Sequence, residues 1–412
     1  MNKKDINELR KQLNKSNCSI TKMCGAYVNS DKDIILNIDE MFLNLEDDEF
    51  DKYLAIAKKT LSGRLGNNLL ELEFPLEEEF TDGKQKFLMD LKESKLKDQE
   101  LLDRFYQLII DSYDYTGNYL ILLFHDTYDV IKKTSDNLNL DESEEVYEYI
   151  ICAICPVDLS KPGLGYLEDE NRIGPRHRDW VVSNPDIGFV FPAFTDRSSD
   201  IHSLMYYTRR PLEPHKELIE LALGCPSKLT AAEEKKTFHS IIKAAAIDSD
   251  QEEKIYSDIQ ESISMLVEEH EALSESPEEE PAFLTNDSVR DILTKSSVPQ
   301  EITDKIEAAY DENFSNQPPV ANHLLDKKVL EQNEKRKVEI ALMDKVEVLE
   351  EELEETKKAV KDNIDGEFDV VLRVKPEKVD QIKAQYIDGV KHILVPLDEN
   401  EQVNVNGVTD IM

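Results

Sequence analysis

The sequence predicts an α+β protein: a mixed sheet domain with helical cover, then a helical linker segment and a small C-terminal β-meander. Two nearly continuous apolar runs, residues 118–124 and 146–156, are typical of central strands covered on both faces. Apolar residues recur at helical spacing from residue 213 onwards. The pairs Asp388-Gly389 and Asn406-Gly407 favour tight hairpin turns near the C-terminus.

The body of the protein is predicted over residues 1–273, with the sheet core at about 18–212 and the helical cover at 213–273. Before the first buried run, apolar periodicity and turn residues predict short helices and strands in alternation. The helices are expected at 4–13, 46–61, 84–93 and 98–113, and the strands at 19–29, 34–38 and 67–74. Shorter strands separated by Pro and Gly follow up to residue 210.

Beyond the body, the chain is expected to divide into smaller segments. Residues 274–286 form an acidic linker rich in Pro, Glu and Ser, and 287–314 form a helical pair. Residues 315–365 hold a linker and a long charged helix, and 366–412 form the β-meander. Apolar positions in the charged helix alternate four and three apart, at Leu342, Val346, Leu349, Leu353, Thr356 and Val360. This pattern allows either a homodimeric coiled coil through residues 342–360 or packing against the chain's own body.

Charge and cysteine content restrict the class of protein. The formal net charge is −38, which disfavours binding to nucleic acid or to an anionic membrane because both are polyanions. An odd number of cysteines, five, and a charged N-terminus without an apolar leader favour a reducing compartment. No apolar run approaches the ~20 residues that a membrane span requires. We therefore expect a soluble cytoplasmic protein with an unidentified protein partner.

Arginine is concentrated in one stretch of this acidic chain. Half of the arginines lie between residues 172 and 210, and the guanidinium group is suited to phosphate and carboxylate. The candidate anion-binding residues are Arg176, Arg178, Arg197 and Arg209. The alternative is that these arginines pair with the carboxylates interleaved among them, in exposed ion pairs worth roughly 0 to 1 kcal/mol each.

Two histidines beside aspartates are the candidate acid–base residues. His125 and Asp126 follow a buried apolar run, which would place them at the C-terminal end of a strand, where catalytic residues gather in α/β proteins. The alternative there is an ordinary strand end. His177 and Asp179 lie within the arginine-rich stretch. In an enzyme, a histidine would act as general acid or base and an aspartate would orient it.

Cofactor and metal motifs are not expected in this sequence. Cys152 and Cys155 form a lone CxxC inside an apolar run, without the second pair that zinc requires. The glycines at 63 and 66 follow a helix and precede a strand, the reverse of a phosphate-binding loop. Neither a cofactor nor a metal site is predicted.

Long motifs spanning nearly the whole chain resemble a bacterial family catalogued as domain of unknown function four-three-one-seven. They include KYLAIAKKTLSGRLGNNLLEL, NYLILLFHDTYDV and RDWVVSNPDIGFVFPAFTDRSSDIHSLMYYTRR. The resemblance implies a bacterial cytoplasmic protein and no particular activity. The sequence thus favours a non-enzymatic interaction or regulatory protein over the alternative, an enzyme that acts on a phosphorylated or carboxylated small molecule through residues 172–210.

Overall fold

The computed structural model divides the chain into two compact units, Met1–Leu330 and Glu331–Met412. It describes residues 1–76, 83–130, 145–273, 281–296, 298–315, 317–365, 372, 374–398, 402–405 and 408–411. Across these residues, no helix combines the length and the apolar character that a membrane crossing demands.

An eight-stranded sheet is the centre of the first unit. Its order is β2-β1-β4-β5-β9-β12-β3, and β8 pairs with the end of β5. The strands are β1 (Lys22–Val28), β2 (Ile34–Met41), β3 (Leu69–Glu73), β4 (Asn118–Val130), β5 (Glu145–Leu159), β8 (Trp180–Val182), β9 (Ile187–Phe191) and β12 (Ser203–Thr208). All of their pairings are antiparallel. The α+β class is therefore confirmed, but the predicted mixed strand arrangement is wrong.

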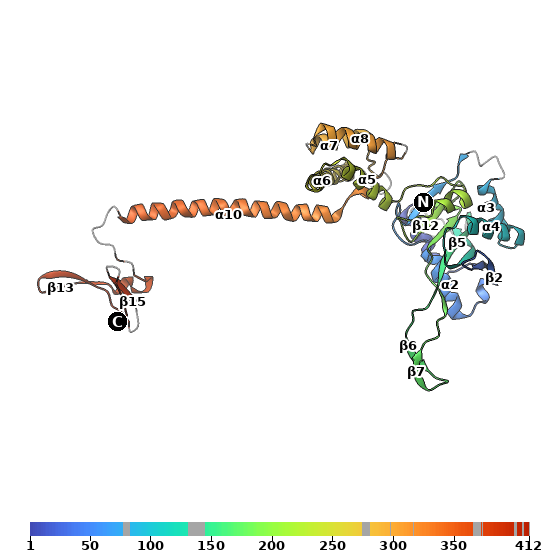
Figure 1. Cartoon of the computed structure of the whole chain (residues 1–412), viewed down its shortest axis with the longest axis horizontal. Coiled ribbons are helices and arrows are strands. Elements are labelled where there is room, and N and C mark those ends of the chain that lie inside the picture. The colour runs from blue at the N-terminus through green and yellow to red at the C-terminus, as the bar shows by residue number, and fades with distance from the viewer. Residues whose placement is uncertain are drawn as a thin grey trace, which may run out of the picture. The chain divides into compact units, whose positions relative to one another are not determined.

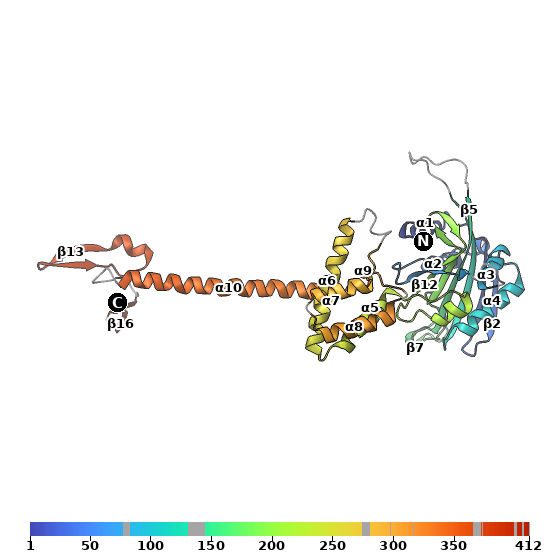
Figure 2. The same ribbon diagram turned by 90° about the horizontal axis from the view of Figure 1, so that it is seen from above.

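Helices cover both faces of this sheet. Helices α1 (Lys3–Gln12) and α2 (Asp47–Lys59) pack on one face. Helices α3 (Lys84–Glu93) and α4 (Gln99–Ser112), with the π-helical segment η3 (Leu218–Leu223), pack on the other (Figure 2).

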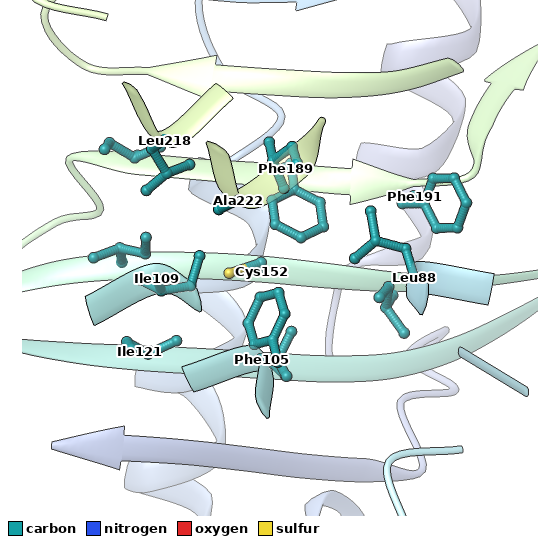
Figure 3. Close-up of a cluster of buried hydrophobic side chains, with 14 of the residues drawn as sticks. Leu88, Phe105, Ile109, Ile121, Cys152, Phe189, Phe191, Leu218 and Ala222 are labelled. Atoms are coloured by element: carbon teal, nitrogen blue, oxygen red, sulfur yellow. The ribbon is translucent and has the colours of Figure 1, made fainter. Parts of the chain in front are cut away.

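The double cover explains why the central strands are continuously apolar. On β4, Ile121 and Leu123 belong to the core under α4, whereas Leu122 and Phe124 belong to the core under α2. Figure 3 shows Phe105 and Ile109 of α4 beside Cys152 of β5, with Phe189 of β9 in the same layer. Successive strand residues point to opposite faces, so both sets must be apolar.

The described cysteines are free thiols. Cys152 lies in the core under α4 and Cys155 in the core under α2, as expected for strand residues three apart. Burial raises the pKa of Cys155 to about 12 and that of Cys152 well above its usual range. Burial also raises the pKa of Cys24 to about 12 and that of the half-buried Cys18 to about 11. Because the thiolate is the reactive form, these residues serve as small apolar side chains.

Close packing also fixes one glycine of the sheet. A Cβ atom added to Gly188 on β9 would lie 2.5 Å from the carbonyl oxygen of Cys152 and 2.6 Å from Cγ2 of Thr60. Thr60 ends α2, so the absence of a side chain at Gly188 lets this helix approach the sheet.

Two short hairpins extend from the sheet strands. Strands β6 (Leu164–Leu167) and β7 (Arg172–Pro175) pair with each other, and the hairpin projects away from the sheet (Figure 1). Strands β10 (Ala193–Thr195) and β11 (Ser198–Asp200) pair across a tight turn in which Asp196 and Arg197 have positive φ.

The helices after residue 230 form a third core. They are α5 (Ala231–Ala245), α6 (Ser249–Leu273), α7 (Asn286–Lys295), α8 (Gln300–Phe314) and α9 (Ala321–Leu324). The apolar stripe of α6, including Ile255, Ile259 and Ile263, is buried in this core. The predicted helical cover over 213–273 therefore divides, because only η3 and the adjoining Cys225 join the core of the sheet. Most of the predicted acidic linker, residues 274–280, lies outside the described residues.

The second unit contains most of a long helix, together with short strands. Helix α10 (Lys327–Asp365) is followed by the 3-10 segment η4 (Pro376–Gln381). Strands β13 (Lys383–Ile387) and β14 (Val390–Leu394) form a hairpin at Asp388-Gly389, where both residues have positive φ as predicted. Strands β15 (Gln402–Val405) and β16 (Val408–Ile411) pair separately, so the described strands form two hairpins instead of one meander. Asn406-Gly407 lies outside the described residues.

Candidate functional site

The centre of the arginine-rich stretch lies on the exposed segment that follows β7. Arg176, His177, Arg178 and Asp179 are all exposed. Arg178 donates from Nε to the carbonyl oxygen of Ser160 at 2.7 Å. Within the described residues, no carboxylate forms an ion pair with Arg176 or Arg178.

Arg197 fastens α1 to the β10–β11 turn. Its Nη2 and Nε lie 3.0 Å and 3.2 Å from Oε1 of Glu8 on α1, and Tyr128 donates its hydroxyl to the same oxygen at 2.6 Å. Although burial lowers the pKa of Arg197, the charge of Glu8 and hydrogen bonds with Tyr128 and Glu8 raise it overall. This arginine is already neutralised by a carboxylate that is remote in sequence.

Arg209 belongs to a cluster around the buried carboxylate of Asp186, whose side chain is 1% exposed. Arg209 Nη2 lies 3.2 Å from Asp186 Oδ1, and Arg210 donates from Nε and Nη2 to the two carboxylate oxygens at 3.2 Å and 2.8 Å. Tyr113 donates its hydroxyl at 3.3 Å, and His215 Nε2 is 3.5 Å away. Burial alone raises the pKa of Asp186, but contacts with His215 and Arg210 and the charge of Arg209 hold it well below its usual range.

His125 and Asp126 lie inside β4 rather than at its C-terminal end, because the strand continues to Val130 in register with β5. The predicted strand-end position is therefore wrong. As neighbours on a strand, the two side chains point to opposite faces. His125 is buried, with Nδ1 2.9 Å from Thr21 Oγ1 and Nε2 2.8 Å from Glu148 Oε1. It cannot be oriented by Asp126.

On the other face, Asp126 accepts hydrogen bonds from the hydroxyl of Tyr149 at 2.7 Å and from the backbone N–H of Thr127 at 2.9 Å. Burial raises the pKa of Asp126, and these hydrogen bonds oppose the rise. Its surroundings are those of a satisfied buried carboxylate.

The predicted catalytic and anion-binding residues do not converge. His125 is paired with Ile150 of β5, whereas the segment that carries Arg178 joins β5 at Leu159. Nine residues of strand separate these positions by about 30 Å. In the described part of the chain, no group of three His, Cys, Asp or Glu residues could hold a metal ion.

Helix α10 carries exposed apolar residues in the four-three pattern. Leu342, Val346, Leu349 and Leu353 of the four-three pattern are each between 54% and 58% exposed. We call the six residues Leu342, Val346, Leu349, Leu353, Thr356 and Val360 the α10 seam. Every residue of the β13–β14 hairpin is also exposed, including Tyr386 at 71%. An isolated two-stranded hairpin is marginally stable in water, so the second unit offers unburied apolar surface on two elements.

One cleft was not anticipated from the sequence. It lies within the first unit, and Arg10 and Arg64 are among the residues that line it. Its lining comes from positions as distant as Asn2 and His323. The one signal in the sequence was the presence of basic residues at the start of a strongly acidic chain.

Fold and site together define a two-unit α+β protein whose predicted catalytic residues are dispersed and whose long helix carries an exposed heptad pattern. The chain belongs to the family described as Domain of unknown function (DUF4317), whose sequence model matches residues 1–408. The resemblance found in the sequence is therefore confirmed. No curated protein matches the chain.

Proposed function

We propose that this protein is a non-enzymatic interaction protein that self-associates through the α10 seam. The observation that carries the proposal is the four-three row of exposed apolar residues on an uninterrupted helix. A helix in water gains nothing from such a row unless a second surface covers it.

The composition of the seam favours two strands at most of its positions. With Val346 as position a of the heptad, position a holds Val346, Leu353 and Val360, and position d holds Leu342, Leu349 and Thr356. In parallel coiled coils, β-branched residues at a with leucine at d favour two strands over three or four, and all seam positions except Leu353 and Thr356 follow this rule.

The flanking charges support a parallel orientation. In a parallel, in-register dimer, Lys345 at position g would face Glu350 at position e of the second copy, and Glu352 would face Lys357. Both pairs are attractive. In the antiparallel arrangement that aligns the six seam residues, Glu350 would instead face Glu350 of the second copy, and this pair is repulsive.

The expected affinity is modest. Full burial of a leucine or valine side chain is worth about 1.5–3 kcal/mol. Leu342, Val346, Leu349 and Leu353 are already about half covered, so each would contribute about 1 kcal/mol. The eight side chains of a dimer would then contribute about 8 kcal/mol against an association cost of at least about 4 kcal/mol. The net gain of at most about 4 kcal/mol corresponds to a reversible dimer with a Kd of about 1 mM or weaker.

The test compares two neighbouring residues of α10 that are equally exposed. Leu349 and Val348 are both 54% exposed, but only Leu349 belongs to the α10 seam. Sedimentation velocity on the full chain should show a dimer that Leu349→Asp converts to monomer and that Val348→Asp preserves. A wild-type chain that forms no detectable dimer at about 1 mM, or equal effects of the two variants, would contradict the proposal.

Orientation has its own test. Lys345→Glu should weaken the dimer through repulsion with Glu350, and the double variant with Glu350→Lys should restore it. Restoration is expected only in the parallel arrangement, because the antiparallel one places position 350 opposite position 350 of the second copy, where Glu350→Lys leaves two like charges. Failure of the double variant to recover association would exclude the parallel dimer.

The alternative, an enzyme acting through residues 172–210, loses support from the placement of its residues. Arg197 and Arg209 are paired with Glu8 and Asp186, and Arg176 and Arg178 lie on an exposed segment. For this reason the proposed role is interaction rather than catalysis at this stretch.

A further inference from the structure

A cleft of about 650 Å³ lies between three parts of the first unit. One wall is α1, the second is the loop between α2 and β3, and the third consists of the end of α6 and residues near α9. Small-molecule sites are typically concave spaces of about 300–1,000 Å³. The cleft is therefore of a size suited to a small organic ligand.

The loop wall is held in place by contacts with the helical part. The carbonyl oxygen of Gly66 accepts a hydrogen bond from Ala231 N at 2.8 Å, and Asn67 Oδ1 accepts one from Ala232 N at 3.1 Å. Gly66 has a positive φ of 76°, and a Cβ there would lie 2.6 Å from Cε1 of His323. These contacts fix the loop against α5 and α9, so the cleft exists without a ligand.

The cleft brings two arginines together in a strongly acidic chain. Arg10 and Arg64 both line it, and among the described lining residues Glu271 is the one carboxylate. The formal charge of the whole chain is −38. Such a local reversal of sign attracts small anions and raises their local concentration.

Arg10 provides an independent sign of a missing partner. Its Nε is buried and has no hydrogen-bond acceptor among the described residues. Buried polar groups in folded proteins are nearly always hydrogen-bonded, and a bound anion is one explanation for an exception. The guanidinium group donates in a planar fork that matches two oxygens of a phosphate. Arg64, an exposed residue, lines the same cleft.

Part of the remaining lining is apolar. The apolar lining residues include Ile6, Leu61, Leu69, Val267 and Val320, beside three asparagines and two histidines. A bare inorganic ion would leave these side chains facing water, whereas a ligand with an apolar or aromatic body would cover them.

We propose that this cleft binds a small molecule that combines a phosphate group with an apolar or aromatic body, with Arg10 and Arg64 contacting the phosphate. The site is separate from the arginine-rich stretch at 172–210 and from the α10 seam. It assigns a ligand-binding role to the first unit, independent of whether the second unit self-associates.

Phenyl phosphate is a suitable probe, with inorganic phosphate and phenylacetate as comparisons. Isothermal titration of the full chain should show saturable binding of phenyl phosphate with a Kd below about 10 mM, and weaker binding of both comparison anions. Arg10→Gln and Arg64→Gln should each weaken binding by about tenfold or more, because each removes a charged hydrogen bond. Arg178→Gln, on the exposed segment outside the cleft, should have no effect.

Arg10 is partly buried, so its variant could also change folding. The exposed Arg64 therefore provides the second variant, and the circular dichroism of both should match the wild type. Absence of saturable binding, binding that neither arginine variant weakens, or equal binding of phenylacetate would each overturn the proposal.

Discussion

Replacement of Asp186 by asparagine tests the cluster that neutralises Arg209 and Arg210. The substitution removes the charge of a carboxylate that is 1% exposed and accepts from both guanidinium groups and from Tyr113. Removal of one partner from a buried ion pair typically costs 3–5 kcal/mol. Because Arg209 and Arg210 are 40% and 45% exposed, water can partly replace the carboxylate. We therefore expect the free energy of unfolding to fall by about 3 kcal/mol, the lower limit of that range.

Urea unfolding of the intact chain, followed by circular dichroism, measures this loss. The control is Glu213→Gln, since Glu213 pairs with Arg210 but is 64% exposed, and we expect a change of about 0–1 kcal/mol. The pKa of Asp186 is lower in the folded protein than its unfolded value of about 3.9. The stabilisation from Asp186 is therefore present above about pH 4. The difference in the free energy of unfolding between the wild type and Asp186→Asn should shrink as the pH falls below about 4.

Two outcomes would refute this reasoning. One is a decrease in the free energy of unfolding for Asp186→Asn that is no larger than the decrease for Glu213→Gln. This result would mean that the cluster is as weak as an exposed ion pair. The other is a difference that stays constant between neutral pH and about pH 3, which would exclude the charge of Asp186 as its cause.

Two further substitutions test the core of the sheet. Tyr149→Phe should lower the free energy of unfolding by about 1–3 kcal/mol, since it removes a hydrogen bond to buried Asp126. Burial raises the pKa of the Asp126 carboxyl. The decrease in the free energy of unfolding should therefore be largest at neutral pH and smaller near pH 4, where protonation of Asp126 is favoured. Gly188→Ala should cost about 1–3 kcal/mol by overpacking, whereas Gly163→Ala, whose added Cβ meets nothing within 4 Å, should be neutral. Urea unfolding at two pH values measures the effect of Tyr149→Phe, and thermal unfolding measures the effects of the two glycine variants. Equal shifts in Tm for Gly188→Ala and Gly163→Ala would contradict the prediction of overpacking at Gly188.

Apolar patterning predicted much of the fold. The runs at 118–124 and 146–156 are adjacent central strands, and the stripe of α6 is buried. Covered strands must be apolar on both faces, so their sequences are distinctive. The strand ends were not predictable from the same signal. β4 continues through Thr127 to Val130 by backbone pairing with β5, and backbone hydrogen bonds place no demand on side-chain polarity.

The candidate site was predicted poorly for a different reason. A local concentration of arginine does not reveal which carboxylates the fold brings close. Arg197 meets Glu8 across 189 positions of sequence, and Arg209 meets an aspartate that is buried between strands. The basic cleft is likewise formed by segments distant in the chain. Pairing of this kind depends on topology, which sequence spacing does not encode.

The burial of the cysteines makes the natural chain convenient for site-specific labelling. With the pKa values of Cys18, Cys24, Cys152 and Cys155 raised by burial and Cys225 buried as well, maleimide reagents should react slowly with the folded protein. A single cysteine introduced at an exposed position of α10 would then carry a fluorophore or spin label without prior removal of the native thiols. Energy transfer between labelled chains could follow assembly directly.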